Sequence, residues 1–384
     1  MPVRATKRGA ERTPLDGAQE VVICGASFAG LAAARELAGS GADVLVVDRY
    51  EIGERQTSAC AAPLEWLTNL GLGDSVCQVF SEIVVHTPSR SIRWQIPWRF
   101  CTFDYRRLCE LLWDQCDARF ETATVAGRTR DGLDHVIHTD RGDLRAALVV
   151  DALGWRRTLS NAEVIQPPQA RLSRGLEVHP AGSGEDFEIW LDPSYIRAGY
   201  AWNFPAGDEL RVGVGSFAPR DHVKEPTVRL AGDLGLPDDG YQGNWIPHQM
   251  RDAVEDGVFF AGDSAGHCLP ATAEGIRPAL FFGLACGREL RHVVDGRQSR
   301  EQALTRYRSL HEDRRFAWRW LLHIQRAIGL LNPHPTMTTV AQAISAQRVI
   351  DRGFAKYLDI CPPPRPKDAP GGGESLAGHT AIPA

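Results

Sequence analysis

A glycine-rich turn between two short apolar runs is the feature of this 384-residue chain that most restricts its fold. The first run, Val21–Cys24, leads into Gly25 and Gly30, and a stretch of small residues then precedes the second run, Asp43–Asp48. Apolar runs of this length are typical of strands buried on both faces of a parallel sheet. Strand, glycine turn, helix, strand and terminal acid follow one another in the order of a dinucleotide-binding unit.

Each position of this unit has a physical task. Gly25 permits the tight turn, Gly30 lets the helix pack closely on the strand, and the helix N-terminus offers free N–H groups to a pyrophosphate. Asp48 lies 23 residues after Gly25 and is placed to bind ribose hydroxyls, while Ser27 replaces the middle glycine of the pattern. The predicted cofactor-binding residues here are Gly25, Ser27, Phe28, Ala29, Gly30, Asp48 and Arg49. A structural glycine turn in an unrelated α/β domain is the alternative.

Two further segments repeat the pattern of an apolar run followed by a glycine turn. They are Ala147–Gly154 and Val258–Gly266, and the second carries Asp263 where its strand should end. A carboxylate at that edge of an open α/β sheet can accept hydrogen bonds from a sugar-like chain. A helix of small residues, Pro278–Arg291, follows, and its N-terminus would favour a negatively charged ring or phosphate.

The order of these segments resembles the FAD-dependent geranylgeranyl reductase group, within the larger class of flavoprotein hydroxylases, halogenases and lycopene cyclases. The resemblance covers roughly residues 21–291 and implies that FAD is the cofactor. It implies that Asp263 holds the ribityl chain, and that an arginine after Phe103, which we assign as Arg106, reaches the FAD. Asp151–Gly154 resembles the Asp-Gly motif of the class, with Leu153 in place of its aspartate. The cofactor-binding residues implied in this part of the chain are Arg106, Gly262, Asp263, Gly275 and Ile276.

An alternating aromatic segment is the narrower signal. Tyr200, Trp202 and Phe204 precede Pro205 in a run similar to the Tyr-x-Trp-x-Phe-Pro motif of the reductases. The alternation predicts a strand that pairs with Leu210–Gly215 through a short turn. Rings on one face of such a sheet would line an apolar, substrate-binding pocket above the flavin. The alternative is that the three rings are only core residues of the sheet.

Cys60 and His267 are the candidate catalytic residues. Cys60 lies in a loop after the second strand, where archaeal reductases carry a cysteine beside the flavin, and a thiol there could protonate the substrate carbon. The alternative for Cys60 is a small buried hydrophobe. His267 could also donate a proton, or could merely cap the next helix.

The expected fold is α/β, with a Rossmann-type FAD-binding domain interwoven with an antiparallel-sheet substrate domain and followed by a C-terminal helical segment. Polar residues recur every three or four positions from Glu312 to Leu331, which predicts a helix packed on the body. The alternative is a helix that touches a bilayer or guides a prenyl chain. The expected division is a disordered leader (1–18), a discontinuous FAD-binding domain (19–80, 101–165 and 250–296), a substrate-binding sheet (81–100 and 166–249), C-terminal helices (297–361) and a disordered tail (362–384).

Composition restricts the partners and the compartment. A formal net charge of -5 argues against a nucleic-acid partner. Nine cysteines without a CxxC pair, and no visible export signal or membrane span, predict a reduced, cytoplasmic protein, with peripheral membrane contact left open. We find no second glycine-rich nucleotide unit and no metal motif. The electron donor is therefore expected to be a transient NAD(P)H or a separate reductase or ferredoxin.

The leading hypothesis is an FAD-dependent oxidoreductase that saturates carbon–carbon double bonds of a lipophilic isoprenoid, such as a geranylgeranyl or polyprenyl lipid. The first alternative is an FAD-dependent monooxygenase of an aromatic or polyketide compound, because the same scaffold serves both. A halogenase is disfavoured, since that family needs a tunnel lysine and none lies between Lys7 and Lys224. A redox-neutral cyclase and a non-catalytic prenyl-lipid or flavin-binding protein are the remaining alternatives.

Overall fold

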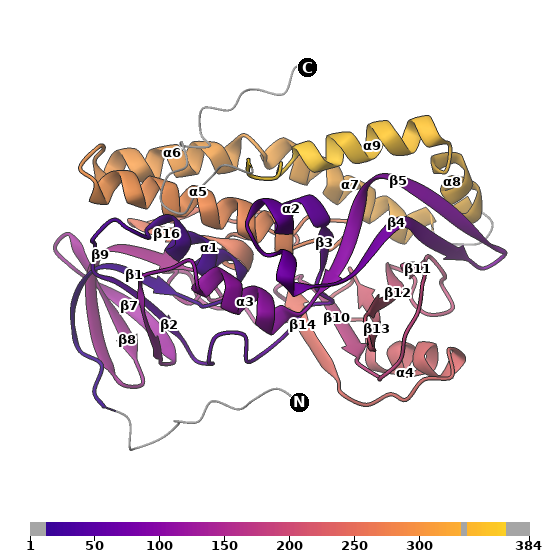
Figure 1. Ribbon diagram of the computed structural model, residues 1–384, viewed down its shortest axis with the longest axis horizontal. Coiled ribbons are helices and arrows are strands. Elements are labelled where there is room, and N and C mark those ends of the chain that lie inside the picture. The colour runs from indigo at the N-terminus through magenta and orange to yellow at the C-terminus, as the bar shows by residue number, and fades with distance from the viewer. Residues whose placement is uncertain (1–12, 332–335, 366–384) are drawn as a thin grey trace.

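The computed structural model describes residues 13–331 and 336–365. In this part of the chain two eight-stranded sheets lie side by side, and long helices cover one side of both (Figure 1). The first sheet contains β1 (Gly17–Cys24), β2 (Val44–Asp48), β6 (Arg119–Thr122), β7 (Val125–Asp131), β8 (Asp134–Thr139), β9 (Gly142–Asp151), β15 (Val254–Glu255) and β16 (Val258–Phe260). The second contains β3 (Ala61–Pro63), β4 (Val76–Thr87), β5 (Arg90–Phe103), β10 (Ser173–Val178), β11 (Glu188–Trp190), β12 (Gly199–Ala206), β13 (Glu209–Ser216) and β14 (Gln242–Ile246).

The helices belong to three groups. Short helices follow strands near the junction of the sheets, α4 lies under the second sheet, and α5 to α9 form the covering layer (Figure 1). They are α1 (Phe28–Glu36), α2 (Leu64–Asn69), α3 (Tyr105–Trp113), α4 (Lys224–Asp233), α5 (Ile276–Val294), α6 (Arg300–Glu312), α7 (Arg315–Leu331), α8 (Thr336–Ile344) and α9 (Gln347–Asp359), with 3₁₀ turns η1 (Gly73–Ser75) and η2 (Gly262–Ala265).

The first sheet has the predicted parallel core. Its strand order is β15-β16-β9-β1-β2-β6, and β1 pairs in parallel with both β2 and β9. The side chains of Val21–Cys24 are fully buried, as expected for a strand covered on both faces. The antiparallel hairpin of β7 and β8, attached to β9, lies outside the motifs that the sequence offered.

The second sheet has the order β14-β10-β13-β12-β11-β4-β5-β3 and is antiparallel except where β11 pairs in parallel with β4. The predicted hairpin of Gly199–Ala206 with Glu209–Ser216 is present as β12 and β13. One face of this hairpin packs on α4 through Val212, Val214 and Leu230. The opposite face carries the three predicted rings. The α/β architecture expected from the sequence is thus confirmed.

The chain moves between the two sheets more than once. It leaves the first sheet after β2, builds β3, β4 and β5, and returns with β6. It leaves again after β9 and returns with β15. Loops that join the sheets therefore meet near the carboxyl ends of β1 and β2. The predicted disordered leader and tail lie largely outside the described residues, although Gly17 and Ala18 already belong to β1.

The helical layer is held to the first sheet by backbone contact between α1 and α5. A Cβ added at Gly283 would lie 2.4 Å from the Ala29 carbonyl oxygen, and one at Gly287 would lie 2.4 Å from the Ala33 carbonyl oxygen. Because neither backbone can give way to such an atom, small residues at these positions set the distance between the helices. No helix in the described part of the chain is long and apolar enough to span a bilayer.

This contact predicts opposite effects for two glycine-to-alanine substitutions. Gly283→Ala should lower the free energy of unfolding by about 1–3 kcal/mol, because the added methyl group overlaps backbone. Gly353→Ala, in α9 with nothing within 4 Å of the added atom, should be neutral or stabilising by about 0.5–1 kcal/mol. Urea unfolding of both variants measures the difference. Equal effects would mean that α1 and α5 do not approach this closely.

Candidate active site

The glycine turn after β1 has the geometry that the sequence predicted. Gly25 has a φ of 114°, and a Cβ there would lie 2.3 Å from the Ala152 carbonyl oxygen. A Cβ at Gly30 would lie 1.8 Å from the Gly25 carbonyl oxygen, so both positions require glycine. The Ser27 side chain does not cap α1; its Oγ accepts a hydrogen bond of 3.1 Å from the Tyr105 hydroxyl. The first N–H groups of α1, from Phe28 onward, therefore remain available to an anion.

Asp48 faces this turn from the end of β2. Its Oδ2 accepts a hydrogen bond of 2.8 Å from Ala26 N, and its Oδ1 accepts one of 3.0 Å from Tyr50 N. Burial raises the pKa of Asp48, and these backbone donors oppose the rise. Arg49, next along the chain, is exposed and lies 4.8 Å from the centroid of the Tyr50 ring. A fixed carboxylate beside a helix N-terminus suits a ribose attached to a diphosphate.

Asp263 lies between the N-termini of α1 and α5. A Cβ at Gly262 would lie 3.0 Å from the Ala29 Cβ, and a Cβ at Gly275 would lie 3.9 Å from Asp263 Oδ1. Within the described ranges the half-buried Asp263 carboxylate has no hydrogen-bond partner, and burial raises its pKa to about 6 against the nearby charge of Arg251. A carboxylate in this state is suited to accept hydrogen bonds from ligand hydroxyls.

Arg106 completes the polar side of the site. A Cβ at Gly53 would lie 2.8 Å from the Arg106 Cα, so the loop after β2 lies against the start of α3. The Arg106 guanidinium is half-buried and donates no hydrogen bond to any residue of the described ranges. Its neighbour Arg107 is exposed and lies 3.8 Å from Glu110. Arg106 therefore fits the predicted contact with a cofactor better than Arg107 does.

These residues together fit a flavin dinucleotide. The turn at Gly25, the carboxylates of Asp48 and Asp263 and the N-terminus of α5 at Gly275 and Ile276 converge from separate segments of the chain. The polar groups match the parts of FAD: amides for the diphosphate, and one carboxylate each for the ribose and the ribityl chain.

The aromatic strand β12 is tied to the loop before α5. The Tyr200 hydroxyl donates a hydrogen bond of 2.5 Å to the Thr272 carbonyl oxygen. The Trp202 ring lies against β13, where a Cβ at Gly213 would come within 2.3 Å of it. Phe204 stacks on Phe187 with 3.8 Å between ring centroids. The three predicted rings thus form one wall next to the loop that leads into Gly275.

That loop is held by α9, through residues that the motifs did not predict as site residues. Ala271 and Ala273 adopt left-handed backbone angles, with φ of 67° and 52°. Glu274 accepts two hydrogen bonds from the fully buried Arg277, of 2.7 and 2.8 Å, and a third from the Tyr357 hydroxyl. Arg277 Nη1 in turn donates to the Cys361 carbonyl oxygen, at 2.9 Å. The i,i+3 spacing of Glu274 and Arg277 was a visible signal, whereas nothing in the sequence pointed to Tyr357.

Cys60 is fully buried at the edge of the second sheet. Its φ is 51°, and its carbonyl oxygen accepts hydrogen bonds from Phe103 N at 3.0 Å and from Arg211 Nη1 at 3.3 Å. Burial raises the pKa of the thiol well above its usual value, and the charge of Arg211 opposes part of this rise. The thiol is therefore neutral and carries its proton at ordinary pH.

His267 occupies the interior of the helical layer. Its ring stacks on Phe282 with 3.6 Å between centroids, and its Nε2 lies 3.0 Å from His311 Nδ1. Burial lowers the pKa of His267 well below its usual value, so the ring stays neutral. Its ring contacts these packing residues, and only its backbone meets another candidate site residue, through a hydrogen bond of 3.1 Å from His267 N to the Gly262 carbonyl oxygen.

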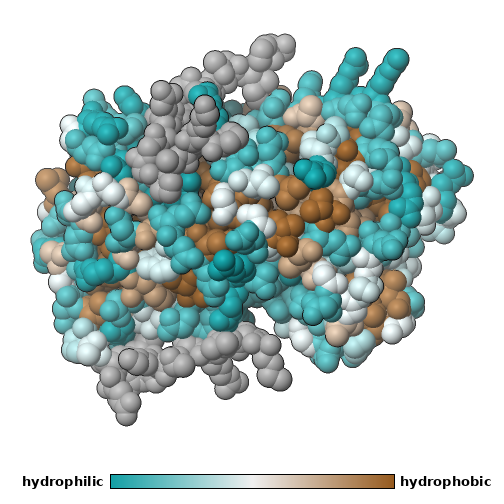
Figure 2. All heavy atoms as spheres, viewed as in Figure 1, coloured by the Kyte–Doolittle hydropathy of each residue, from teal (hydrophilic) through white to brown (hydrophobic). Residues whose placement is uncertain are grey.

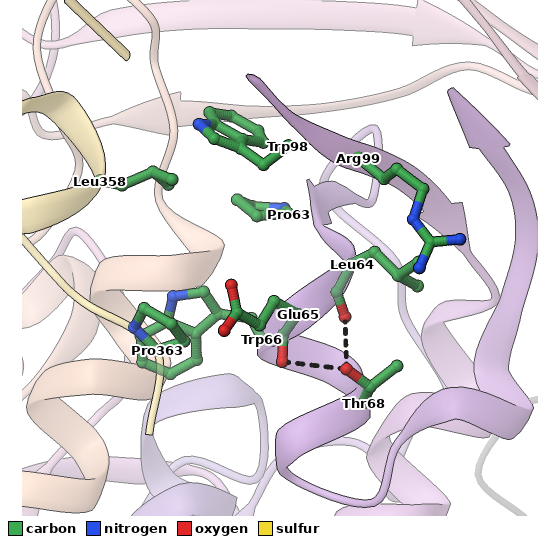
Figure 3. A pocket seen from close by; sticks show the side chains of 9 residues that line it. All are labelled: Pro63, Leu64, Glu65, Trp66, Thr68, Trp98, Arg99, Leu358 and Pro363. Atoms are coloured by element: carbon green, nitrogen blue, oxygen red, sulfur yellow. Dashed lines mark hydrogen bonds between the residues drawn. The ribbon is translucent and has the colours of Figure 1, made fainter. Parts of the chain in front are cut away.

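A pocket of about 250 Å³ opens between α2, β5 and the segment after α9 (Figure 3). Most of its lining is apolar, with Trp66 and Trp98 facing it (Figure 3). The lining residues are Pro63, Leu64, Glu65, Trp66, Thr68, Trp98, Arg99, Leu358 and Pro363. The surface shows a hydrophobic area over α2 and β3, in the middle of the face in Figure 2.

A row of rings joins this pocket to the aromatic wall. Centroids of Trp98 and Phe100 lie 5.5 Å apart, those of Phe100 and Phe187 lie 5.3 Å apart, and Phe187 stacks on Phe204. Trp94, Trp98 and Phe100 alternate with other residues along β5, in a segment for which the sequence predicts only membership of the substrate-binding sheet (81–100).

The chain is similar to several characterised proteins, although no protein-family model matches it. It is 25% identical to digeranylgeranylglycerophospholipid reductase 1 of Methanopyrus kandleri, over 85% of this chain and 94% of that protein. It is 26% identical to the chloroplastic geranylgeranyl diphosphate reductase of Arabidopsis thaliana and 22% identical to a digeranylgeranylglycerophospholipid reductase of Methanothrix thermoacetophila.

The alignment with the Arabidopsis thaliana protein covers 46% of this chain and 37% of that protein. The alignment with the Methanothrix thermoacetophila protein covers 43% of this chain and 46% of that protein. Both of these matches are thus partial, whereas the match to the Methanopyrus kandleri protein extends over most of both chains.

Solved structures share the fold. A geranylgeranyl bacteriochlorophyll reductase-like protein of Thermoplasma acidophilum superposes with a TM-score of 0.70 at 18% identity, over 90% of this chain and 99% of that chain. The p-nitrophenol 4-monooxygenase of Pseudomonas putida superposes with a TM-score of 0.71 at 15% identity, over 91% of this chain and 99% of that chain. At these identities the likeness establishes the architecture alone.

The environment of Asp263 predicts a pH-dependent stability in the cofactor-free protein. Because the folded-state pKa is raised to about 6, the folded protein bears a cost once the carboxylate ionises. This cost is absent below about pH 4 and complete above pH 6. Asp263→Asn should therefore raise the free energy of unfolding by about 1–3 kcal/mol at pH 8 and leave it unchanged near pH 4. Urea titrations of both proteins at the two pH values measure this, and an equal effect at both would contradict the assigned environment.

Proposed function

We propose that this chain reduces carbon–carbon double bonds of an isoprenoid lipid. It is a relative of the geranylgeranyl reductases and an FAD-dependent oxidoreductase. The resemblance predicted from the sequence motifs is confirmed by the curated relatives, which are named as reductases of geranylgeranyl lipids. The observation that carries the finer proposal is the apolar, aromatic surface that runs from Tyr200 to the pocket beside Trp98.

In this proposal FAD is held by the residues that converge at the carboxyl ends of β1 and β2. The amides at the start of α1 bind the diphosphate, Asp48 binds the ribose, and Asp263 binds the ribityl chain. Arg106 and Arg49 supply positive charge near the diphosphate. The remaining cofactor contacts come from Gly25, Ser27, Phe28, Ala29, Gly30, Gly262, Gly275 and Ile276.

The protein's part in the reaction is to orient the substrate, exclude water and supply a proton. Reduced flavin, when bound, supplies the hydride that goes to one carbon of the double bond. The Cys60 thiol gives its proton to the other carbon, so the S–H bond breaks as a C–H bond forms. Tyr200, Trp202 and Phe204 hold the chain in an apolar environment from which water is excluded. His267 has no role in this scheme because its ring is stacked in the interior.

A monooxygenase acting on an aromatic or polyketide compound is the second candidate. The structural likeness to p-nitrophenol 4-monooxygenase, with a TM-score of 0.71, favours it. The two candidates differ in the fate of oxygen, since the reductase needs none and the monooxygenase incorporates one atom of it. The electron donor for either is proposed to be NAD(P)H binding transiently, or a separate reductase or ferredoxin.

A product mass spectrum tests the proposal directly. The FAD-loaded protein is incubated with a chemical reductant and a geranylgeranyl lipid, with and without air. We expect the mass of the lipid to rise by pairs of hydrogen atoms under both conditions. Addition of oxygen, seen only in air, would contradict the proposal and favour the monooxygenase.

The same assay separates a proton donor from a packing residue at Cys60. Cys60→Ala should lower the turnover number by about 100-fold, in the range of a lost general acid, with flavin content unchanged. The matched control is Cys286→Ala, a fully buried cysteine of α5, which should keep the rate. Equal rates in the two variants would remove Cys60 from the mechanism.

We also propose that α7 touches the membrane surface from which such a lipid would be taken. Phe316, Trp320 and Leu330 are 72%, 58% and 82% exposed, whereas Trp318 and Leu321 on the other side of α7 are buried. The exposed side also carries Arg319 and Arg326, whose charges suit anionic headgroups. Aromatic and aliphatic side chains flanked by arginine are typical of helices that lie in the interface.

Vesicle binding tests this surface. Phe316→Ser with Trp320→Ser should lower the affinity for phosphatidylglycerol vesicles by at least tenfold, because two large apolar side chains no longer enter the interface. Leu133→Ser is the matched control, since Leu133 is 73% exposed in the β7–β8 turn. Co-sedimentation measures both. Equal binding by the double variant and the control would contradict contact through α7.

A further inference from the structure

A network of four charged side chains runs through the second sheet, on the face that carries Trp202. It consists of Glu177 and His179 on and just after β10, and of Glu209 and Arg211 on β13. The side chains of Glu177, His179 and Arg211 are only 4%, 6% and 4% exposed. Buried charges are costly unless they are paired and hydrogen-bonded, so these three, joined through the more exposed Glu209, call for an explanation.

One end of this network binds the aromatic wall. Glu177 Oε2 accepts a hydrogen bond of 3.2 Å from Trp202 Nε1, and Glu177 Oε1 accepts one of 2.9 Å from His179 Nε2. His179 Nδ1 lies 3.1 Å from Glu209 Oε1, and Arg211 Nε donates to that same oxygen at 3.0 Å. The indole of Trp202 is therefore linked to the guanidinium of Arg211 without a break.

The other end holds the loop that carries Cys60. Arg211 Nη1 donates hydrogen bonds to the carbonyl oxygens of Ala59 at 2.8 Å, Phe103 at 3.0 Å and Cys60 at 3.3 Å. Cys60 has a φ of 51°, a left-handed conformation that is unfavourable for a non-glycine residue. A loop in this conformation needs an external constraint, and Arg211 supplies it from the neighbouring strand.

The charges of the four side chains in this network balance when His179 is protonated. Burial alone would lower the pKa of His179, but its hydrogen bonds to Glu177 and Glu209 raise that pKa to about 9. Gln242, from β14, is the other polar side chain against His179, at 3.4 Å. Two carboxylates thus face one imidazolium and one guanidinium, which makes the group neutral overall near pH 7.

We propose that Arg211, held by Glu209, His179 and Glu177, is a positioning residue that fixes the Cys60 loop relative to the Trp202 wall. The inference rests on the proposed function, in which Cys60 donates a proton to the isoprenoid chain of a lipid lying against Trp202. No residue of the group needs to touch the substrate. Its role is to keep donor and wall at one separation, since small displacements of a proton donor slow its reaction strongly.

The alkylation rate of Cys60 tests this without substrate or turnover. The flavin-loaded protein is treated with iodoacetamide, and labelling of each cysteine is followed by mass spectrometry. In Arg211→Met we expect Cys60 to be labelled at least tenfold faster, because its loop has lost three hydrogen bonds. Cys286, fully buried in α5, should keep its rate. Arg93→Met is the control variant, because Arg93 is an exposed arginine of the same sheet, paired with Asp186.

Two outcomes would overturn the proposal: an unchanged rate at Cys60 in Arg211→Met, or an equal rise in Arg93→Met. If Arg211→Met labels every cysteine, Glu209→Gln decides the matter, since it removes only the ion pair that orients Arg211. A rise of threefold or more at Cys60 alone would then support the proposal, and no selective rise would contradict it. Because the readout involves no lipid, its failure is distinguishable from failure of the proposed reduction.

Two conservative variants test the effect of this network on turnover and on KM for the lipid. Arg211→Lys keeps the charge, but its single nitrogen replaces both Nε, which binds Glu209, and Nη1, which binds the carbonyl groups, so its turnover should fall at least fivefold while flavin content stays constant. Trp202→Phe keeps a ring but loses the link to Glu177, and should raise KM for the lipid more than it lowers kcat. A loss of flavin or of folding in step with activity would instead indicate a purely structural role.

Discussion

The backbone contact between α1 and α5 determines where the other parts of the candidate site lie. Gly283 and Gly287 let α5 approach the carbonyl oxygens of α1 directly, and Gly262 brings η2 against Ala29. The N-termini of both helices and the Asp263 carboxylate are therefore close together at the ends of β1 and β16. A dinucleotide can interact with two positive helix ends and two carboxylates only if these distances are short.

The second sheet completes the site from the other side, and it is joined to the first by hydrogen bonds rather than by packing alone. Tyr200 reaches the loop before α5, and Arg211 reaches the loop before β3. Tyr357 adds the C-terminal helix to the same loop before α5. Three segments distant in sequence thus fix the two loops between which the proposed flavin ring and lipid would meet.

The sequence points to those parts of the candidate site that are encoded by local patterns. Gly25, Asp48 and Asp263 could be found because strand, turn and helix signals stand next to them in the chain. Arg211 and Tyr357 could not, since their partners lie 152 and 83 residues away and only folding brings them together. His267 shows the converse case: its position after a glycine turn suggested the site, but packing against Phe282 turns its ring into the interior.

The proposed function requires that reduced flavin in this protein passes its electrons to a carbon–carbon double bond and not to oxygen. The measurement is anaerobic reoxidation of the bound flavin. The flavin is first reduced, a geranylgeranyl lipid is added without oxygen, and the visible absorbance of the flavin is recorded over time. We expect the absorbance of oxidised flavin to return in the absence of oxygen, at a rate that depends on lipid concentration. A flavin that stays reduced with lipid and is reoxidised only when air is admitted would contradict it.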